Sequence, residues 1–123
     1  MYLYDCYYFS KDQKNWTDAK SSCQSKASML AEVVSSDQRD FLKTKAEENR
    51  YTFWLGGTDI VTESVWMWTT SQTTFTFTDW HPNNPSNDDG NENCLEMRQS
   101  VDFLWNDNFC YHTNNYICQR PYI

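Results

Sequence analysis

The chain has 123 residues, a formal net charge of −7 and an aromatic content of 17%. This length predicts one domain over residues 1–123, and the aromatic residues predict a packed core rather than a disordered chain. The negative charge argues against nucleic acid and anionic membrane surfaces as partners, and no apolar run reaches the roughly 18 residues that a membrane span needs. The acidity instead suits a cation such as calcium, or serves only to keep the domain soluble.

The N-terminal part predicts a short strand followed by a helix. Three consecutive aromatic residues at 7–9 are typical of a strand. Trp16, Ala19 and Cys23 then recur at helical spacing, so the helix that they predict has one inward face. Thr17 is the predicted cap at the start of this helix.

A second helix is predicted from residue 35 towards residue 48. Ser35 and Gln38 fit a capping box, in which each residue satisfies a backbone N–H group of the other. Phe41 and Leu42 continue a helical stripe behind this cap. Both predicted helices therefore lie in the first half of the chain.

After residue 49 the pattern changes from helix to strand. Aromatic and β-branched residues indicate strands at 52–56, 65–68, 74–77, 95–97 and 116–118. Thr and Phe alternate in 74–77, which predicts a strand with both Phe side chains on one face. Two helices followed by several strands predict an α+β domain, and a strand near each terminus lets the two ends pair.

Residues 79–93 predict no regular element, because turn-forming residues run through the whole segment. A structureless loop of about 15 residues inside a compact domain is uncommon and is usually functional. Its carboxylate, amide and hydroxyl oxygens are also the ligands that a hard cation prefers. This loop is therefore the candidate functional segment.

Five cysteines predict a disulfide framework, namely Cys6, Cys23, Cys94, Cys110 and Cys118. No two have the C-x-x-C spacing of a zinc ribbon or a thioredoxin-like motif. Met1 begins no recognisable signal peptide, but a disulfide framework indicates an oxidising compartment and hence a secreted, extracellular protein. Spacing alone leaves the pairing open, and one cysteine remains over, either free or joining two chains.

An ordered set of motifs runs through nearly the whole chain: Trp16-Thr17-Asp18-Ala19 with Cys23, Trp54-Leu55-Gly56-Gly57, Trp66-Met67-Trp68, Glu92-Asn93-Cys94, Trp105-Asn106-Asp107, Cys110 and Tyr116-Ile117-Cys118. In this order and spacing they resemble the C-type lectin-like domain family, and especially the short secreted, perlucin-like lectins of molluscs and other invertebrates. The resemblance implies a double-loop fold in which two helices flank antiparallel strands. Trp54, Trp66 and Trp105 are then expected in the core.

The resemblance also implies how the cysteines pair. Cys23 is matched to Cys118 and Cys94 to Cys110, while Cys6 corresponds to the second cysteine of an N-terminal hairpin whose first cysteine this chain lacks. Because an unpaired cysteine in a secreted protein favours pairing between chains, we expect a homodimer linked through Cys6.

A calcium and sugar site made of three parts is implied as well. The triplet Asn84-Pro85-Ser86 follows Trp80 where the family has Glu-Pro-Asn or Gln-Pro-Asp, and Glu92 is the acid before the next cysteine. The third part is the Trp-Asn-Asp motif. The implied calcium ligands are Asn84, Glu92, Asn106 and Asp107, and the implied sugar-binding residues are these four together with Ser86.

The triplet departs from the family pattern. Asn84 is one methylene shorter than Glu or Gln, and Ser86 offers only a hydroxyl group, so we expect weaker calcium binding than in a complete site. Two alternatives therefore stay open: glycan binding without calcium, or loss of sugar binding in favour of contact with protein or mineral. The usual rule relating the triplet to sugar preference cannot be applied to Asn-Pro-Ser.

The expected function is that of a secreted carbohydrate-binding lectin, taking part in innate recognition or agglutination. A glycosidase would need two carboxylates on either side of a sugar. Glu92 and Asp107 could supply them, but no pattern marks one of them as a catalytic acid, and no Ser/His/Asp order or phosphate loop is present. We therefore expect no enzymatic activity.

Overall fold

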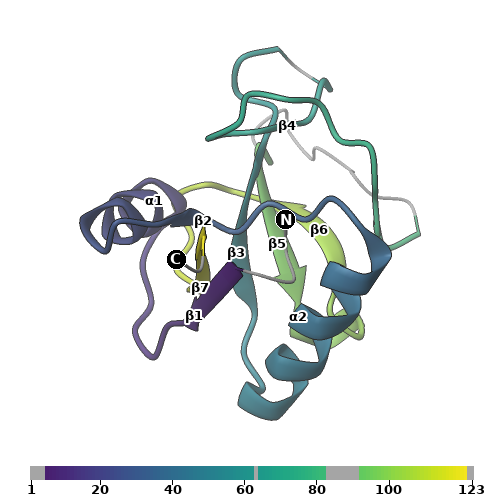
Figure 1. Ribbon diagram of the computed structural model, residues 1–123. Coiled ribbons are helices and arrows are strands. Elements are labelled where there is room, and N and C mark those ends of the chain that lie inside the picture. Colours follow the sequence, from purple (N-terminus) through teal and green to yellow (C-terminus); the bar gives the residue numbers. More distant parts are fainter. Residues whose placement is uncertain (1–4, 63, 83–91, 122–123) are drawn as a thin grey trace.

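The structure, a computed structural model, describes residues 5–62, 64–82 and 92–121. Figure 1 shows two helices flanking a twisted sheet. In chain order the elements are β1 (Asp5–Phe9), α1 (Trp16–Ser25), β2 (Met29–Leu30), α2 (Ser36–Asn49), β3 (Phe53–Thr58), β4 (Met67–Trp68), β5 (Cys94–Arg98), a 3₁₀ helix (Gln99–Val101), β6 (Leu104–Asn108) and β7 (Asn115–Pro121). The predicted α+β class is confirmed. No described helix is long and apolar enough to cross a membrane.

The cap of helix α1 is Asn15, two residues before the predicted cap. Asn15 has an extended backbone, and its side-chain oxygen accepts a hydrogen bond from the Asp18 backbone N–H at 2.8 Å. The prediction of Thr17 as the cap was wrong, because Thr17 already lies in the first turn. The inward face is the one predicted from helical spacing, formed by Trp16, Ala19 and Cys23.

Helix α2 begins at the predicted cap, Ser35, whose Oγ accepts a hydrogen bond from the Gln38 N–H at 3.2 Å. The buried Gln38 side chain does not complete a capping box. Its Nε2 donates to the Glu32 carbonyl at 2.8 Å, and its Oε1 accepts from the Val34 N–H at 2.8 Å. These bonds attach α2 to the segment that leads out of β2.

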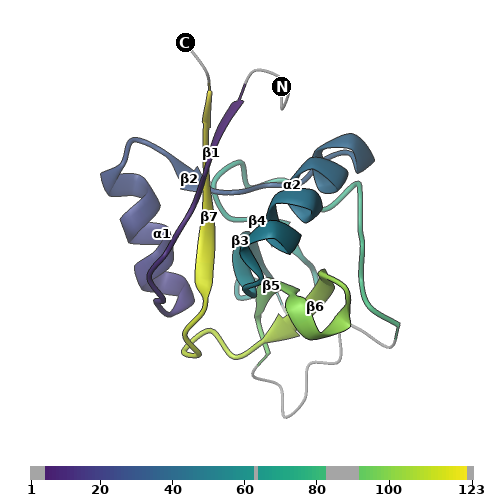
Figure 2. The ribbon, with the colours of Figure 1, turned by 90° about the horizontal axis from the view of Figure 1, so that it is seen from below.

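The strands form a sheet with the order β1-β7-β3-β5-β6, while β2 also pairs with β7 and β4 with β3. All pairs are antiparallel except β3 with β7, which run parallel through Phe53 and Trp54. As expected, the strands near the two termini pair, with Asp5 opposite Pro121, and Figure 2 shows β1 and β7 side by side. The outer strand on the other side of the sheet is β6.

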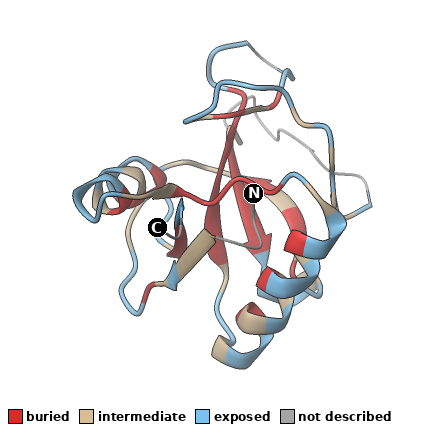
Figure 3. Cartoon of the chain, in the orientation of Figure 1, coloured by how far each residue is buried: buried red, intermediate tan, exposed pale blue. Residues whose placement is uncertain are grey.

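The core lies around β3, which is buried along its whole length (Figure 3). Trp54, Trp66 and Trp105 are buried as predicted, with exposed fractions of 0%, 8% and 1%. The predicted strand at 74–77 is absent: Thr74 forms a single bridge with Met67, and no regular strand follows. Thr and Phe alternate in this segment because the two Phe rings pack on the core, and not because the segment pairs with another strand.

Both expected disulfides are present. Cys23–Cys118 joins α1 to β7, and Cys94–Cys110 joins β5 to the turn after β6. Cys6 is the cysteine left over, and it lies half-buried in β1.

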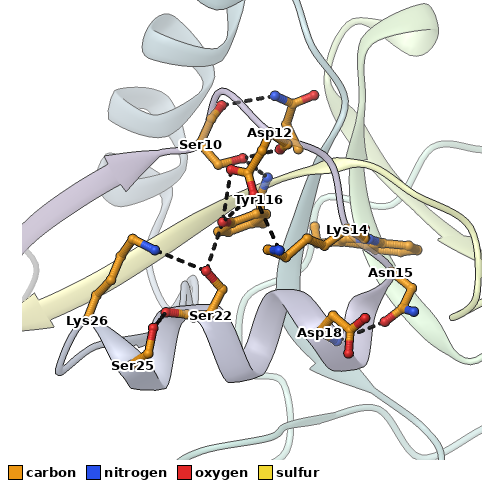
Figure 4. Close-up of polar contacts among 11 residues, drawn as sticks. Ser10, Asp12, Lys14, Asn15, Asp18, Ser22, Ser25, Lys26 and Tyr116 are labelled. Atoms are coloured by element: carbon orange, nitrogen blue, oxygen red, sulfur yellow. Dashed lines mark hydrogen bonds and ion pairs between the residues drawn. The ribbon is translucent and has the colours of Figure 1, made fainter.

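A polar cluster also ties α1 to β7 (Figure 4). The buried hydroxyl group of Tyr116 lies 2.9 Å from Ser22 Oγ and donates to Asp12 Oδ1 at 3.0 Å. Burial raises the pKa of the Tyr116 phenol above its ordinary value. This cluster holds the N-terminal segment against the last strand.

Candidate functional site

The start of the 79–93 loop is fixed beside β6. Residues 79–81 run parallel to the outer edge of this strand: Trp105 N–H donates to the Asp79 carbonyl, and His81 N–H donates to the Trp105 carbonyl, both at 2.9 Å. Helix α2 reinforces this position through Arg39, whose Nη1 lies 2.6 Å from Asp79 Oδ1. The hydrogen bond to Asp79 raises the pKa of Arg39. The loop therefore leaves the sheet one residue away from Asn106.

The end of the loop is fixed as well. The Asn93 carbonyl accepts hydrogen bonds from Thr58 Oγ1 at 2.6 Å and from the Asp59 N–H at 3.2 Å. These donors belong to the last residue of β3 and to the residue that follows it. Cys94 then begins β5 and carries the disulfide to Cys110. Glu92 consequently stands next to an anchored residue.

The Trp-Asn-Asp motif forms part of β6. Asn106 lies opposite Glu96 of β5, and Asp107 lies opposite Leu95. Successive side chains of a strand point to opposite faces, so the side chains of Asn106 and Asp107 leave β6 on different sides. Asp107 is fully buried, whereas Asn106 and Glu92 are half-buried.

The position of β6 allows Asn106 and Asp107 to contact one ligand although their side chains leave opposite faces of the strand. Because β6 is the outer strand of the sheet, a ligand beyond its edge can be approached by side chains from both faces. Among the described residues, the Trp80–Trp105 bridge is the pairing on this edge. Two further predicted site residues, Asn84 and Ser86, lie outside the described residues.

Sequence reasoning missed Glu96. Its carboxylate is buried and accepts hydrogen bonds from three asparagine side chains: Asn106 Nδ2 donates to Oε2 at 2.8 Å, and Asn108 and Asn114 Nδ2 donate to Oε1 at 2.9 Å each. Arg98 Nη1 lies 3.7 Å from Oε2. The sequence did carry a signal, namely a carboxylate within an otherwise apolar predicted strand. Because acids are rarely buried unless they are paired, such a residue predicts polar partners from elsewhere in the fold.

The donor types suit calcium. Glu92, Asn106 and Asp107 offer only oxygen ligands, as hard cations prefer, and the neighbouring Asn93 Oδ1 is buried without a hydrogen-bond partner in the described part of the chain. Within residues 5–62, 64–82 and 92–121, no three His, Cys, Asp or Glu side chains form a group that could hold a metal. These residues therefore fit calcium in kind, but they supply only part of a coordination shell.

Comparison with known proteins gives consistent matches over nearly the whole chain. The Lectin C-type domain family matches residues 12–120. A perlucin-like protein of Mytilus galloprovincialis is 32% identical over 121 residues, which cover 95% of this chain and 77% of that protein.

Two solved structures show the same architecture. The mouse scavenger receptor C-type lectin carbohydrate-recognition domain has a TM-score of 0.89 at 30% identity and covers 96% of this chain and 91% of its own. A calcium-independent type II antifreeze protein has a TM-score of 0.86 at 27% identity, with coverages of 98% and 88%. The fold implied by the sequence motifs is thereby confirmed.

Proposed function

Because the chain belongs to the C-type lectin domain family, we propose that it is a secreted lectin whose ligand is a glycan or a monosaccharide. The observation that carries this proposal is the attachment of the 79–93 loop. Its first residues pair with Trp105, and its end is bonded to β3 through Asn93. Glu92 and Asn106 each lie one residue from these anchors, so these two candidate ligands belong to a prearranged part of the fold. Prearrangement lowers the entropy lost on binding.

In this proposal, Glu92, Asn106 and Asp107 hold calcium, with Asn84 as the weakest side-chain contributor and Ser86 as a contact to sugar. Bound calcium supplies coordination positions for two vicinal sugar hydroxyl groups. The carboxylates of Glu92 and Asp107 balance the charge of the ion, and the protein oxygens accept hydrogen bonds from the same hydroxyls. A shallow site of this kind buries little area, so we expect a dissociation constant of about 1 mM for a monosaccharide.

A second candidate function is binding without calcium. Two observations favour it: the altered triplet Asn84-Pro85-Ser86, and the similarity to an antifreeze protein described as calcium-independent. Direct hydrogen bonds from the loop would then replace the ion, or the ligand would not be a sugar.

Secretion, dimerisation and the lack of catalysis are part of the same proposal. The two disulfides support an oxidising, extracellular location. Cys6, half-buried and without a partner in its own chain, supports a disulfide-linked homodimer, which would raise avidity by presenting two sites. A role in innate recognition would follow from binding foreign glycans, and we propose no enzymatic activity.

The test is a glycan array probed with the protein in calcium and again in chelator, followed by calorimetry of the best ligand. Asp107→Asn removes one candidate carboxylate ligand. Asp102→Asn is the matched control, because Asp102 is an exposed residue with a positive φ of 59°, a conformation that asparagine tolerates. Thermal unfolding of both variants shows whether the buried substitution preserves the fold.

The calcium-dependent proposal expects sugar binding that disappears in chelator and in Asp107→Asn, while Asp102→Asn binds like the unaltered protein. Equal sugar binding with and without chelator supports the second candidate. An array with no glycan bound in either condition rejects lectin activity for this chain.

A further inference from the structure

The side-chain amide of Asn106 has one defined orientation. Its Nδ2 donates to Glu96 Oε2 at 2.8 Å, so its Oδ1 is the amide atom directed away from Glu96. An amide group has one end that donates hydrogen bonds and one end that accepts, and only the oxygen end can bind a cation or accept a hydrogen bond from a hydroxyl group. The role of Asn106 as a ligand therefore depends on which end faces outward.

We propose that Glu96 is the positioning residue of the site, holding the Asn106 amide with its oxygen outward. This inference rests on the proposed function of Asn106 as a ligand and extends it to a residue that does not itself touch the ion or the sugar. A carboxylate is suited to the task because it only accepts hydrogen bonds and so admits one orientation of a facing amide.

The surroundings of Glu96 strengthen this constraint. Its side chain is only 2% exposed, so water cannot replace a lost partner easily. Asn108 and Asn114 donate to the other oxygen, Oε1, so that both oxygens of the carboxylate have amide donors. Asn114 also exchanges two backbone hydrogen bonds with Lys14, and this pairing keeps the turn after β6 in place.

Replacing Glu96 by glutamine would turn this arrangement into a conflict. A glutamine amide presents oxygen on one side and NH₂ on the other. With its oxygen towards the two donors, Asn108 and Asn114, its NH₂ group faces Asn106. The Asn106 amide must then rotate to offer its oxygen inward, and its NH₂ group would face the proposed calcium.

The experiment is a cycle of three variants: Glu96→Gln, Asn106→Asp and the two combined. The combined variant exchanges the carboxylate and the amide across the 2.8 Å hydrogen bond without changing net charge. The carboxylate that Asn106→Asp introduces has two oxygens, so it presents an oxygen outward in either orientation. Calcium affinity is measured by calorimetry with calcium chloride, and unfolding midpoints are measured in chelator. Glu32→Gln is the control for loss of a buried carboxylate, because Glu32 is 5% exposed and accepts its hydrogen bonds from Thr70 and Ser71.

We expect Glu96→Gln to weaken calcium binding by about 10- to 100-fold, as is typical for residues that orient a metal ligand. The combined variant should regain the affinity of the unaltered protein or exceed it, and Glu32→Gln should leave affinity unchanged. In chelator, Asn106→Asp alone should lower the unfolding midpoint, because it sets two carboxylates against each other, and adding Glu96→Gln should raise the midpoint again.

The results that would overturn the proposal are distinguishable. If the unaltered protein binds calcium and Glu96→Gln binds it equally well, the positioning role is wrong while the proposed site stands. The role is also wrong if the combined variant binds as weakly as Glu96→Gln. An unaltered protein that binds no calcium overturns the calcium site itself, and the positioning role with it.

Discussion

The two disulfides close loops of very different length, and this difference gives a quantitative prediction. The paired cysteines are 95 residues apart in Cys23–Cys118 and 16 apart in Cys94–Cys110. If a disulfide acts mainly by lowering the entropy of the unfolded chain, removing the first should cost about 4.7 kcal/mol and removing the second about 3 kcal/mol. The shorter loop lies within the longer one, which reduces the larger value by only about 0.2 kcal/mol.

Packing acts in the same direction. Cys23, Cys94 and Cys118 are fully buried, whereas Cys110 is half-buried, so truncation to alanine leaves the larger void at Cys23–Cys118. We therefore expect the double variant Cys23→Ala/Cys118→Ala to lose at least about 1.5 kcal/mol more stability than Cys94→Ala/Cys110→Ala.

The assay is urea unfolding at equilibrium in chelator, which excludes stabilisation by bound calcium. Both double variants and their parent carry Cys6→Ser, so that no free thiol can exchange with the remaining disulfide. Equal losses of stability, or a larger loss for the Cys94–Cys110 pair, would refute the argument from loop length. That result would indicate that β5 and the turn after β6 need their disulfide for local order.

Three further predictions concern single residues. Gly56→Ala should destabilise the fold by about 1–3 kcal/mol or more, measured by urea unfolding, because a Cβ atom there would lie 2.9 Å from the Leu30 carbonyl oxygen, which is backbone and cannot move aside. Burial raises the pKa of Tyr116 in the folded state, so the folded protein retains the phenol proton at pH values where the unfolded chain releases it. The contribution of the Tyr116 phenol to stability should therefore be complete below about pH 10 and should fall as the pH rises through the folded pKa. Tyr116→Phe should flatten this pH dependence, whereas Tyr111→Phe, at a 71% exposed residue, should not. Finally, a non-reducing gel should show a dimer that Cys6→Ser abolishes, and a protein that runs only as monomer, with Cys6 freely alkylated, would contradict the interchain disulfide.

Local sequence patterns were sufficient wherever neighbouring residues decide the structure. The inward face of α1 follows from helical spacing, and the start of α2 from Ser35, because both depend on residues within a few positions. Thr17 shows the limit of such reasoning, since Asn15 is an equally suitable cap by residue type. In the structure Asn15 has the extended backbone of a cap, and Thr17 lies in the first turn.

The disulfide pairing needed more than spacing, because five cysteines allow many arrangements. The resemblance to a known family resolved it, and the pairs Cys23–Cys118 and Cys94–Cys110 agree with that inference. The strand-like pattern at 74–77 also depended on a distant partner. Alternation indicates which side chains are buried, but a strand needs a neighbouring strand with free backbone groups, and within this described segment only Thr74 forms a bridge.

By itself, the sequence determined the fold class, the two helices, the tryptophan core and the loop in which to look for function, because each is encoded in residue type and short-range order. Only the tertiary structure decided that β3 and β7 pair in parallel, since their contact joins residues about 60 positions apart whose pairing no local pattern specifies. It also decided the role of Glu96. The register of β5 against β6 brings that carboxylate to Asn106, and the turn after β6 adds Asn114. No local pattern links Glu96 to these asparagines, and burying the carboxylate among three amide donors is what gives the Asn106 amide a single orientation.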